Sequence, residues 1–292
     1  MLLPMKIGVA YPQTELRGDP VAVREFGISI EDLGFDHILA YDHVLGAVHA
    51  DRTPPLTGPY TERDPFHDPF VMFAYLAGIT KRLQFTTGIL VLPQRQTAVV
   101  ARQATDVDLL SGGRLRLGVG IGWNYVEYEA LGQDFHTRGA RQEEQIGLLH
   151  QLFSEPVVDF TGRFDRIDRA SLLPKPTRPI PIWLGGSGEK AFDRAARLGD
   201  GFIFFGGGVD RAADSWRRMR ERAGDLGRSG ENFGGNYVAL SGADVGKLTG
   251  EIDAWREAGG THLTVVTMGL GLESVGGHID YLSSLARTVE LQ

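Results

Sequence analysis

Residues 111–132 read SGGRLRLGVGIGWNYVEYEALG, and the rest of the chain can be organised around them. From Arg114 to Gly122, apolar residues alternate with small or basic ones, which is the period of a β-strand. Glycines gather at the end of this strand, where Trp123 and Asn124 follow. Glycine weakens a strand, so it is expected there only if a ligand or another backbone comes very close. The pattern predicts that residues 118–123 are a strand arriving at the floor of a pocket.

Other strands are predicted from short, mostly apolar runs that are bounded by glycine, proline or polar residues. These runs are residues 6–11, 35–40, 83–92, 182–184, 201–205, 236–240 and 262–267. Helices are predicted between them, at residues 20–34, 70–79, 97–110, 138–153, 189–198, 210–226, 245–258 and 274–289. The segment 70–79 is apolar nearly all round and is expected to be a buried helix.

Eight strands that alternate with helices imply a parallel sheet with right-handed crossovers. Eight such units are the number that closes a (β/α)8 TIM barrel, an α/β fold whose site lies at the carboxyl ends of the strands. We therefore expect one barrel domain over residues 1–292, with an open doubly wound sheet as the alternative. Two additions are expected: an insertion rich in Pro, Gly and Asp at 45–69, after the second strand, and a small hairpin at 157–167, before the fifth.

The composition limits the classes of partner. The chain has 292 residues, a formal net charge of −7 and no cysteine. The acidic balance argues against a nucleic-acid partner, and the lack of cysteine excludes disulfides and thiolate metal sites. No run approaches the roughly 18 apolar residues of a membrane span, and Leu2, Leu3 and Pro4 are too few for a signal-peptide core. A cytoplasmic protein with no membrane partner is expected.

The carboxyl ends of the predicted strands bring together residues that are far apart in the sequence. Asp42 and His43 come directly after the second strand, and Trp123 and Asn124 follow the fourth. The Asp-His pair has two interpretations: the aspartate caps a following helix, or the histidine moves a proton at the pocket floor. Trp123 and Asn124 are the predicted substrate contacts.

Two glycine-rich turns follow the fifth and sixth strands. Gly185-Gly186-Ser187-Gly188 opens a predicted helix, where free N–H groups and the helix dipole favour an anion and Ser187 can cap. Gly206-Gly207-Gly208 either widens the same phosphate cradle or is a flexible turn. An ordinary strand-to-helix turn is the alternative for the first of them.

Several common chemistries do not match. Trp123 stands where a dinucleotide fingerprint beginning at Gly118 needs its third glycine, and Glu189 stands where a nucleophile elbow at Ser187 needs its last one. The histidines show no paired metal-ligand spacing, so no metal is expected. The arginines of the sixth helix are predicted to form a solvated face; they are residues 211, 217, 218, 220 and 222.

Residues 114–132, the run PIPIWLGGSGEKAFDRAARLGDGF at 179–202 and Asp42-His43 together resemble the bacterial luciferase-like superfamily. Within it they look closest to oxidoreductases that use the deazaflavin coenzyme F420, and the likeness covers almost the whole chain. It implies a flavin-like ring held at the barrel mouth, with Asp42 and His43 beside the reactive ring and the Gly185–Gly188 turn on the cofactor phosphate. It also implies a bulge with a non-proline cis peptide under the ring, at Gly88, Ile89 and Leu90, between the last two.

The chain departs from one branch of this superfamily. Relatives that act on glucose 6-phosphate have a carboxylate at the position of Trp123 and a lysine after strand six, where this chain has Gly206, Gly207 and Gly208. A non-phosphorylated substrate is therefore expected. Aromatic residues suggest that this substrate is flat and apolar; they are Tyr60, Phe66, Trp123 and Tyr125.

The predicted function is hydride transfer between coenzyme F420 and a small organic molecule. In this hypothesis His43 moves the accompanying proton, and Asp42 positions the ring edge or the histidine. One alternative keeps the fold but uses reduced FMN and oxygen, as a monooxygenase. A second is a barrel that binds a flavin or deazaflavin without catalysis. A homodimer is expected by analogy with relatives.

Overall fold

The computed structural model describes residues 5–228 and 233–291, so that Leu2, Leu3 and Pro4 lie outside the described residues. The main sheet contains β1 (Lys6–Ala10), β2 (His37–Ala40), β3 (Gln84–Thr87), β4 (Leu90–Val91), β5 (Leu115–Gly120), β8 (Ile182–Gly185), β9 (Gly201–Phe205), β10 (Gly234–Ala239) and β11 (His262–Val265). A separate antiparallel hairpin contains β6 (Val158–Thr161) and β7 (Arg166–Ala170). The hairpin predicted before the fifth barrel strand is thereby confirmed.

The helices are α1 (Gln13–Leu16), α2 (Pro20–Asp32), α3 (Pro69–Ala77), α4 (Thr97–Leu110), α5 (Tyr125–Ala130), α6 (Arg138–Ser154), α7 (Glu189–Leu198), α8 (Val209–Asp225), α9 (Val245–Glu257) and α10 (Val275–Thr288). Two short 3-10 turns are added, η1 (Leu92–Gln94) and η2 (Phe135–Thr137). Across residues 5–228 and 233–291, no helix is long and apolar enough to cross a membrane.

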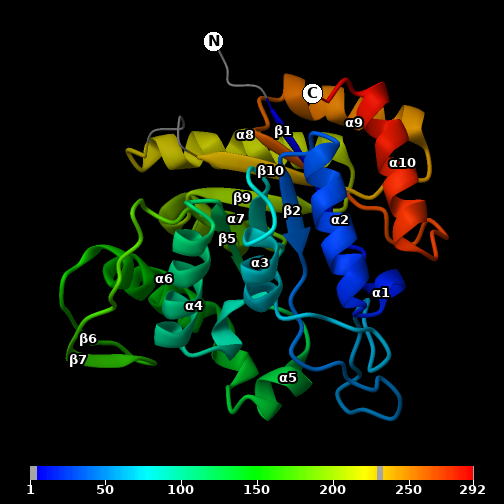
Figure 1. Cartoon of the computed structure of the whole chain (residues 1–292). Helices are drawn as coiled ribbons and strands as arrows, with labels where there is room; N and C mark the ends of the chain where they lie inside the picture. Colours follow the sequence, from blue (N-terminus) through cyan, green and yellow to red (C-terminus); the bar gives the residue numbers. More distant parts are fainter. Residues whose placement is uncertain (1–4, 229–232, 292) are drawn as a thin grey trace.

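The main sheet closes on itself. Its parallel strands run in the order β3-β2-β1-β11-β10-β9-β8-β5-β4, and β3 also pairs with β5, at Phe85 and Leu115. Because β3 and β4 are two segments of one barrel position, eight positions make the ring, which confirms the (β/α)8 barrel. Helices surround the ring, and the insertion after β2 lies at the same end as α5, in the lower part of Figure 1. Between Tyr41 and Asp68 the chain forms no helix or strand.

Local signals explain where the early helices begin. Asp19 and Asp68 each accept a hydrogen bond from a backbone N–H of the first turn, at 2.9 and 3.1 Å, and a proline follows each of them. One detail of the predicted helix at 70–79 is wrong, because α3 is not buried all round. Val71 and Tyr75 are 68% and 45% exposed, since the helix packs on the outside of the barrel and turns one side to solvent.

The apolar core has two parts. The larger fills the space between the sheet and the helices and includes Val9, Phe26 and Phe85. The smaller, here called the inner cluster, alternates along the strands with the first and so projects into the barrel. It comprises Ala10, Leu39, Tyr41, Trp183, Ile203, Val238 and Val266, with Phe66, Ile89 and Met268 packed against it. The inner cluster forms the floor beneath the carboxyl ends of the strands.

The third barrel strand is interrupted by a bulge. Thr86 is opposite Arg116 and Leu90 is opposite Val119, so three residues of one strand face two of the other. The non-proline cis peptide lies inside this bulge, between Gly88 and Ile89. The prediction that it joins Ile89 to Leu90 is therefore wrong, because regular pairing with β5 has already resumed at Leu90. The predicted continuous strand at 83–92 is likewise divided at this point.

The glycines of β5 make room for the bulge. A Cβ atom added to Gly118 would lie 2.0 Å from the carbonyl oxygen of Thr87, and one added to Gly120 would lie 2.5 Å from Ile89. A Cβ atom added to Gly185 would also lie 2.5 Å from the Ile89 side chain. The expectation that another backbone approaches this strand closely is confirmed at Gly118.

We expect Gly118→Ala to destabilise the protein by about 2–3 kcal/mol, because the new methyl group meets rigid backbone rather than a side chain that can move. Urea unfolding followed by circular dichroism measures the change. The matched control is Gly147→Ala, in an exposed position of α6 where an added Cβ meets nothing within 4 Å. That substitution should leave stability unchanged or raise it by up to about 1 kcal/mol. Equal stability of the two variants would show that the Thr87 carbonyl does not lie as close to Gly118 as described.

Candidate active site

Asp42 lies directly after β2, and its side chain is buried. Its Oδ2 accepts a hydrogen bond from the Val91 N–H at 2.9 Å, and its Oδ1 is 2.7 Å from Nη2 of Arg95. Burial raises the pKa of Asp42, while the charge of Arg95 and the Val91 N–H act in the opposite direction. Burial alone would lower the pKa of Arg95, but its pairing with Asp42 and Asp68 leaves that pKa raised. Both carboxylate oxygens of Asp42 therefore hold β4 and the Arg95 guanidinium in place.

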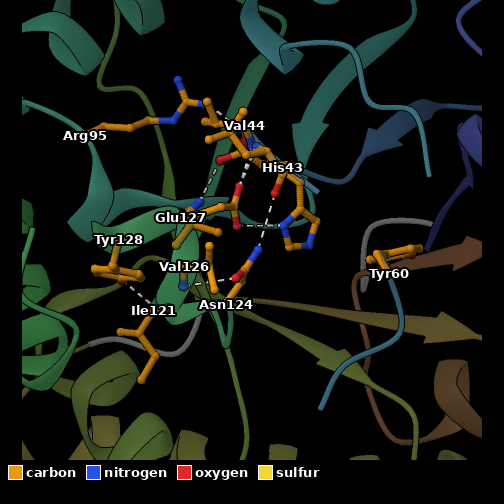
Figure 2. Close-up of polar contacts among 12 residues, drawn as sticks. His43, Val44, Tyr60, Arg95, Ile121, Asn124, Val126, Glu127 and Tyr128 are labelled. Atoms are coloured by element: carbon orange, nitrogen blue, oxygen red, sulfur yellow. Dashed lines mark hydrogen bonds and ion pairs between the residues drawn. The ribbon is translucent and has the colours of Figure 1, made fainter. Parts of the chain in front are cut away.

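His43 is held by a different carboxylate. Its Nδ1 is 2.9 Å from Oε2 of Glu127, which lies in α5 and is 1% exposed as a side chain. The Oε1 atom of Glu127 accepts hydrogen bonds from the Val44 and Leu45 N–H groups, at 2.6 and 3.0 Å. Figure 2 shows Glu127 between the imidazole and the start of the insertion. Among the described residues, Nε2 of His43 has no hydrogen-bond partner, so it is the ring nitrogen that can act on a ligand.

Aromatic rings surround the histidine. The ring centroids of Phe66, Tyr60 and Trp123 lie 4.9, 5.5 and 5.5 Å from that of His43. Tyr41 continues the group, 6.3 Å from Tyr60. We call His43 and these four aromatic residues the mouth group. Burial raises the pKa of Tyr60 to about 12, and the Tyr41 hydroxyl is buried without a partner in the described part of the chain. Both phenols therefore remain protonated donors near neutral pH.

The insertion after β2 is fastened to the segment that follows β5. The predicted substrate residue Asn124 is buried, caps α5 by accepting the Val126 N–H at 3.1 Å, and donates to the Leu45 carbonyl at 3.3 Å. The Tyr125 hydroxyl donates to the Pro54 carbonyl at 2.7 Å. A Cβ atom on Gly58 would lie 2.3 Å from the Trp123 ring, so this glycine packs directly on the indole. The segment from Trp123 to Glu127 thus holds the insertion over the mouth.

The three residues predicted under the cofactor ring do not all face the mouth. Ile89 packs against the inner cluster, and a Cβ on Gly88 would meet Leu39 of that cluster at 2.2 Å. Leu90 is fully buried in the larger core, between the sheet and the helices. Its side chain therefore lies on the opposite side of the strand from Ile89, and only Gly88 and Ile89 are placed to support a ligand.

Two open turns follow β8 and β9, which are neighbouring strands. Gly186, Ser187 and Gly188 are exposed, and α7 begins after Gly188 without a side-chain cap. The predicted cap by Ser187 is therefore wrong, because Gly188, at φ +80°, occupies the capping position itself. Gly206, Gly207 and Gly208 all have positive φ, and α8 also begins without a side-chain cap. Both turns leave helix N-terminal N–H groups free for an anion.

The sequence interpretation missed Glu127 and could not place Tyr60 and Phe66. The one signal for Glu127 is its position three residues after Asn124, the spacing of a capping box. In the structure its carboxylate binds His43 and the insertion instead. Tyr125, predicted with the other aromatic residues, packs against Phe135, 6.3 Å away between centroids. The arginines predicted as a solvated face, 211, 217, 218, 220 and 222, are all exposed.

Comparison with known proteins finds a matching family and similar folds. Residues 1–242 match the family model of the luciferase-like monooxygenases. An uncharacterised protein of Mycobacterium tuberculosis strain H37Rv is 38% identical over 201 residues, 66% of this chain and 69% of that one. An F420-dependent glucose-6-phosphate dehydrogenase of Segniliparus rotundus is 30% identical over 211 residues, 70% of this chain and 58% of that one.

Solved structures share the fold at low sequence identity. An F420-dependent secondary alcohol dehydrogenase in complex with an F420-acetone adduct has a TM-score of 0.78 at 18% identity, over 97% of this chain and 98% of that one. A monooxygenase from Streptomyces bottropensis has a TM-score of 0.75 at 18% identity, over 98% and 100%. The barrel, the sequence match and these relatives together establish that the chain belongs to the luciferase-like monooxygenase family.

Proposed function

We propose that the protein is an oxidoreductase that transfers a hydride between coenzyme F420 and a flat, apolar, non-phosphorylated organic substrate. The observation that carries this proposal is the mouth group, in which Nε2 of His43, without a partner among the described residues, lies beside three aromatic rings. The named F420-dependent relatives support the choice of cofactor. The mouth group lies at the carboxyl ends of the strands, where barrel enzymes carry their sites.

The chain's residues fit a deazaflavin that carries a phosphate. The turns at Gly185–Gly188 and Gly206–Gly208 offer unpaired backbone N–H groups at two adjacent helix starts, which suits a phosphate. Ile89 and the inner cluster offer an apolar floor for a flat ring, and the buried Tyr41 hydroxyl has no partner within residues 5–228 and 233–291. When bound, the deazaflavin would supply the carbon that gives or takes the hydride.

The protein's own part is to move a proton and to exclude water. His43 Nε2 gives or takes the proton that accompanies the hydride, at a site that the insertion covers. Arg95, which lies beside Asp42, is already paired with the carboxylates of Asp42 and Asp68. The aromatic rings of Phe66, Tyr60 and Trp123 beside His43 favour an uncharged, apolar substrate.

Titration with each cofactor tests the proposal. Purified protein is titrated with F420 and separately with FMN, and each mixture is then tested for oxidation or reduction of a panel of alcohols, carbonyls and enones. We expect tight binding and turnover with F420. Oxygen-dependent product formation with reduced FMN would instead support a monooxygenase. Binding without any spectral change across the panel would favour a non-catalytic barrel. The predicted homodimer stays a prediction.

Gly58→Ala is expected to weaken substrate binding by roughly 10- to 100-fold in KM, the loss that follows a change of about 1–3 kcal/mol in a packed pocket. The added methyl would displace either the insertion or the Trp123 ring. Cofactor affinity should change little, because the glycine turns lie elsewhere. Steady-state kinetics with the best substrate found measures the effect.

A double-mutant cycle shows whether the indole transmits this effect. In a Trp123→Ala background, Gly58→Ala should add almost nothing, since the contact has already been removed. Additive losses in KM would mean that Gly58 acts independently of Trp123, contrary to the packing described above.

A further inference from the structure

Glu127 is the one carboxylate that contacts His43 in the described part of the chain. Its side chain is 1% exposed and comes from α5, 84 residues further along the chain. Its Oε2 lies 2.9 Å from His43 Nδ1, and its Oε1 accepts hydrogen bonds from the Val44 and Leu45 N–H groups at 2.6 and 3.0 Å. A buried carboxylate must be satisfied in this way to remain charged.

The contact determines which ring nitrogen of His43 carries hydrogen. An ionised carboxylate only accepts hydrogen bonds, so Nδ1 must be the protonated nitrogen when the ring is neutral. Nε2 then holds the free lone pair and faces away from Glu127. The same carboxylate stabilises the ring when Nε2 gains a proton, because the imidazolium charge lies beside it. Packing by Phe66, Tyr60 and Trp123 keeps the ring in this orientation.

The other oxygen of Glu127 fixes the start of the insertion. Its bonds to the backbone of Val44 and Leu45 set the path of the chain immediately after His43. Asn124, three residues earlier, holds the same point through the Leu45 carbonyl at 3.3 Å. Figure 2 shows the contacts of Glu127 with His43 and Val44. One side chain therefore orients the histidine and anchors the segment that covers it.

We propose that Glu127 is the positioning residue of His43. It holds the Nδ1–H tautomer and leaves Nε2 to exchange the proton. It also couples this state of the ring to the position of the insertion. The inference rests on the role proposed above for His43. It concerns a residue that acts through the histidine, so its removal should change the chemical step more than the binding of cofactor.

Glu127→Gln tests the charge while keeping the shape. Its amide oxygen can still accept from Val44 and Leu45, but its NH2 group can only donate to Nδ1, which forces the Nε2–H tautomer. We expect kcat with F420 to fall by roughly 100-fold or more, with KM and cofactor Kd within about threefold of wild type. Glu127→Asp retains the charge and should recover part of this loss. The matched control is Glu129→Gln, an exposed position of the same helix, which should behave as wild type.

Nitrogen NMR of His43 provides a readout that does not depend on turnover. In cofactor-free protein labelled on its histidines, the neutral ring should carry hydrogen on Nδ1 in the wild type and in Glu129→Gln, and on Nε2 in Glu127→Gln. This result together with the kinetic loss supports the inference. An unchanged tautomer, or an unchanged kcat despite the switched tautomer, overturns it. If no cofactor supports turnover, the proposed function fails, whereas the NMR result still decides whether Glu127 sets the tautomer.

Discussion

His43→Ala should lower turnover with F420 by roughly 10²–10⁴-fold, the range that a positioned proton donor or acceptor contributes. Cofactor Kd should change by less than about threefold, because binding is assigned to the glycine turns and the apolar floor rather than to the imidazole. The structure supports this separation, since His43 is bonded to Glu127 on one side and presents Nε2 on the other. Stopped-flow hydride transfer and fluorescence titration of F420 measure the two quantities.

His150→Ala is the control for this substitution, because His150 is exposed on α6, away from the mouth group. It should leave both quantities unchanged. Parallel losses of turnover and affinity in His43→Ala would remove the histidine from the proton-transfer role and make it a binding residue.

Asp42→Ala is expected to destabilise the protein by about 3 kcal/mol, because the largely buried Arg95 guanidinium loses its closest carboxylate and keeps only the partly exposed Asp68. The Val91 N–H also loses its acceptor, so the bulge at β4 should loosen. Chemical unfolding in urea gives the change in the free energy of unfolding. Any loss of activity should follow from this loss of structure, since both Asp42 oxygens hold other parts of the protein.

Removing both partners separates the charge effect from the packing effect. The double variant Asp42→Ala/Arg95→Met no longer contains a largely buried cation that has lost its closest carboxylate, so it should be more stable than the sum of the single changes implies. Strict additivity would mean that the pair is not coupled. Normal stability of Asp42→Ala, combined with lost hydride transfer, would instead support the role that the sequence suggested, in which Asp42 positions the ring edge or the histidine.

Much of the fold follows from local sequence signals. The helices at 97–110 and 189–198 and the strand at 201–205 have the same limits in the sequence prediction and in the structure. Each of these segments has its own apolar periodicity. The glycine and polar residues at its ends mark where it starts and stops. The number of strands then predicts the barrel without any knowledge of which strands pair.

The break in the third barrel strand is different, because it depends on two strands at once. The run at 83–92, LQFTTGILVL, reads as one continuous strand, yet its pairing with β5 skips one residue. Gly118, Gly120 and Gly185 accommodate that bulge from the neighbouring strands. No pattern within the run itself shows where the backbone must change direction.

The candidate site was predictable only in part for the same reason. Asp42 and His43 are adjacent in sequence, but the carboxylate of Asp42 goes to Arg95 while His43 takes its partner from α5. Glu127 lies in α5, a short helix that was not predicted from the sequence, and Tyr60 and Phe66 lie in an insertion with no period. These residues come together around His43 only when the chain folds. Their contacts therefore cannot be read from composition or from spacing in the sequence.

Identifying the cofactor that the protein retains tests the central claim most directly. The protein is produced in a host that contains both F420 and FMN, purified, and its bound small molecule is analysed by mass spectrometry and absorbance. The account predicts that F420 is retained, and that it is lost when bulky residues replace Gly186 and Gly207 in the two turns. Retention of FMN, or retention of F420 that does not depend on those turns, would contradict it.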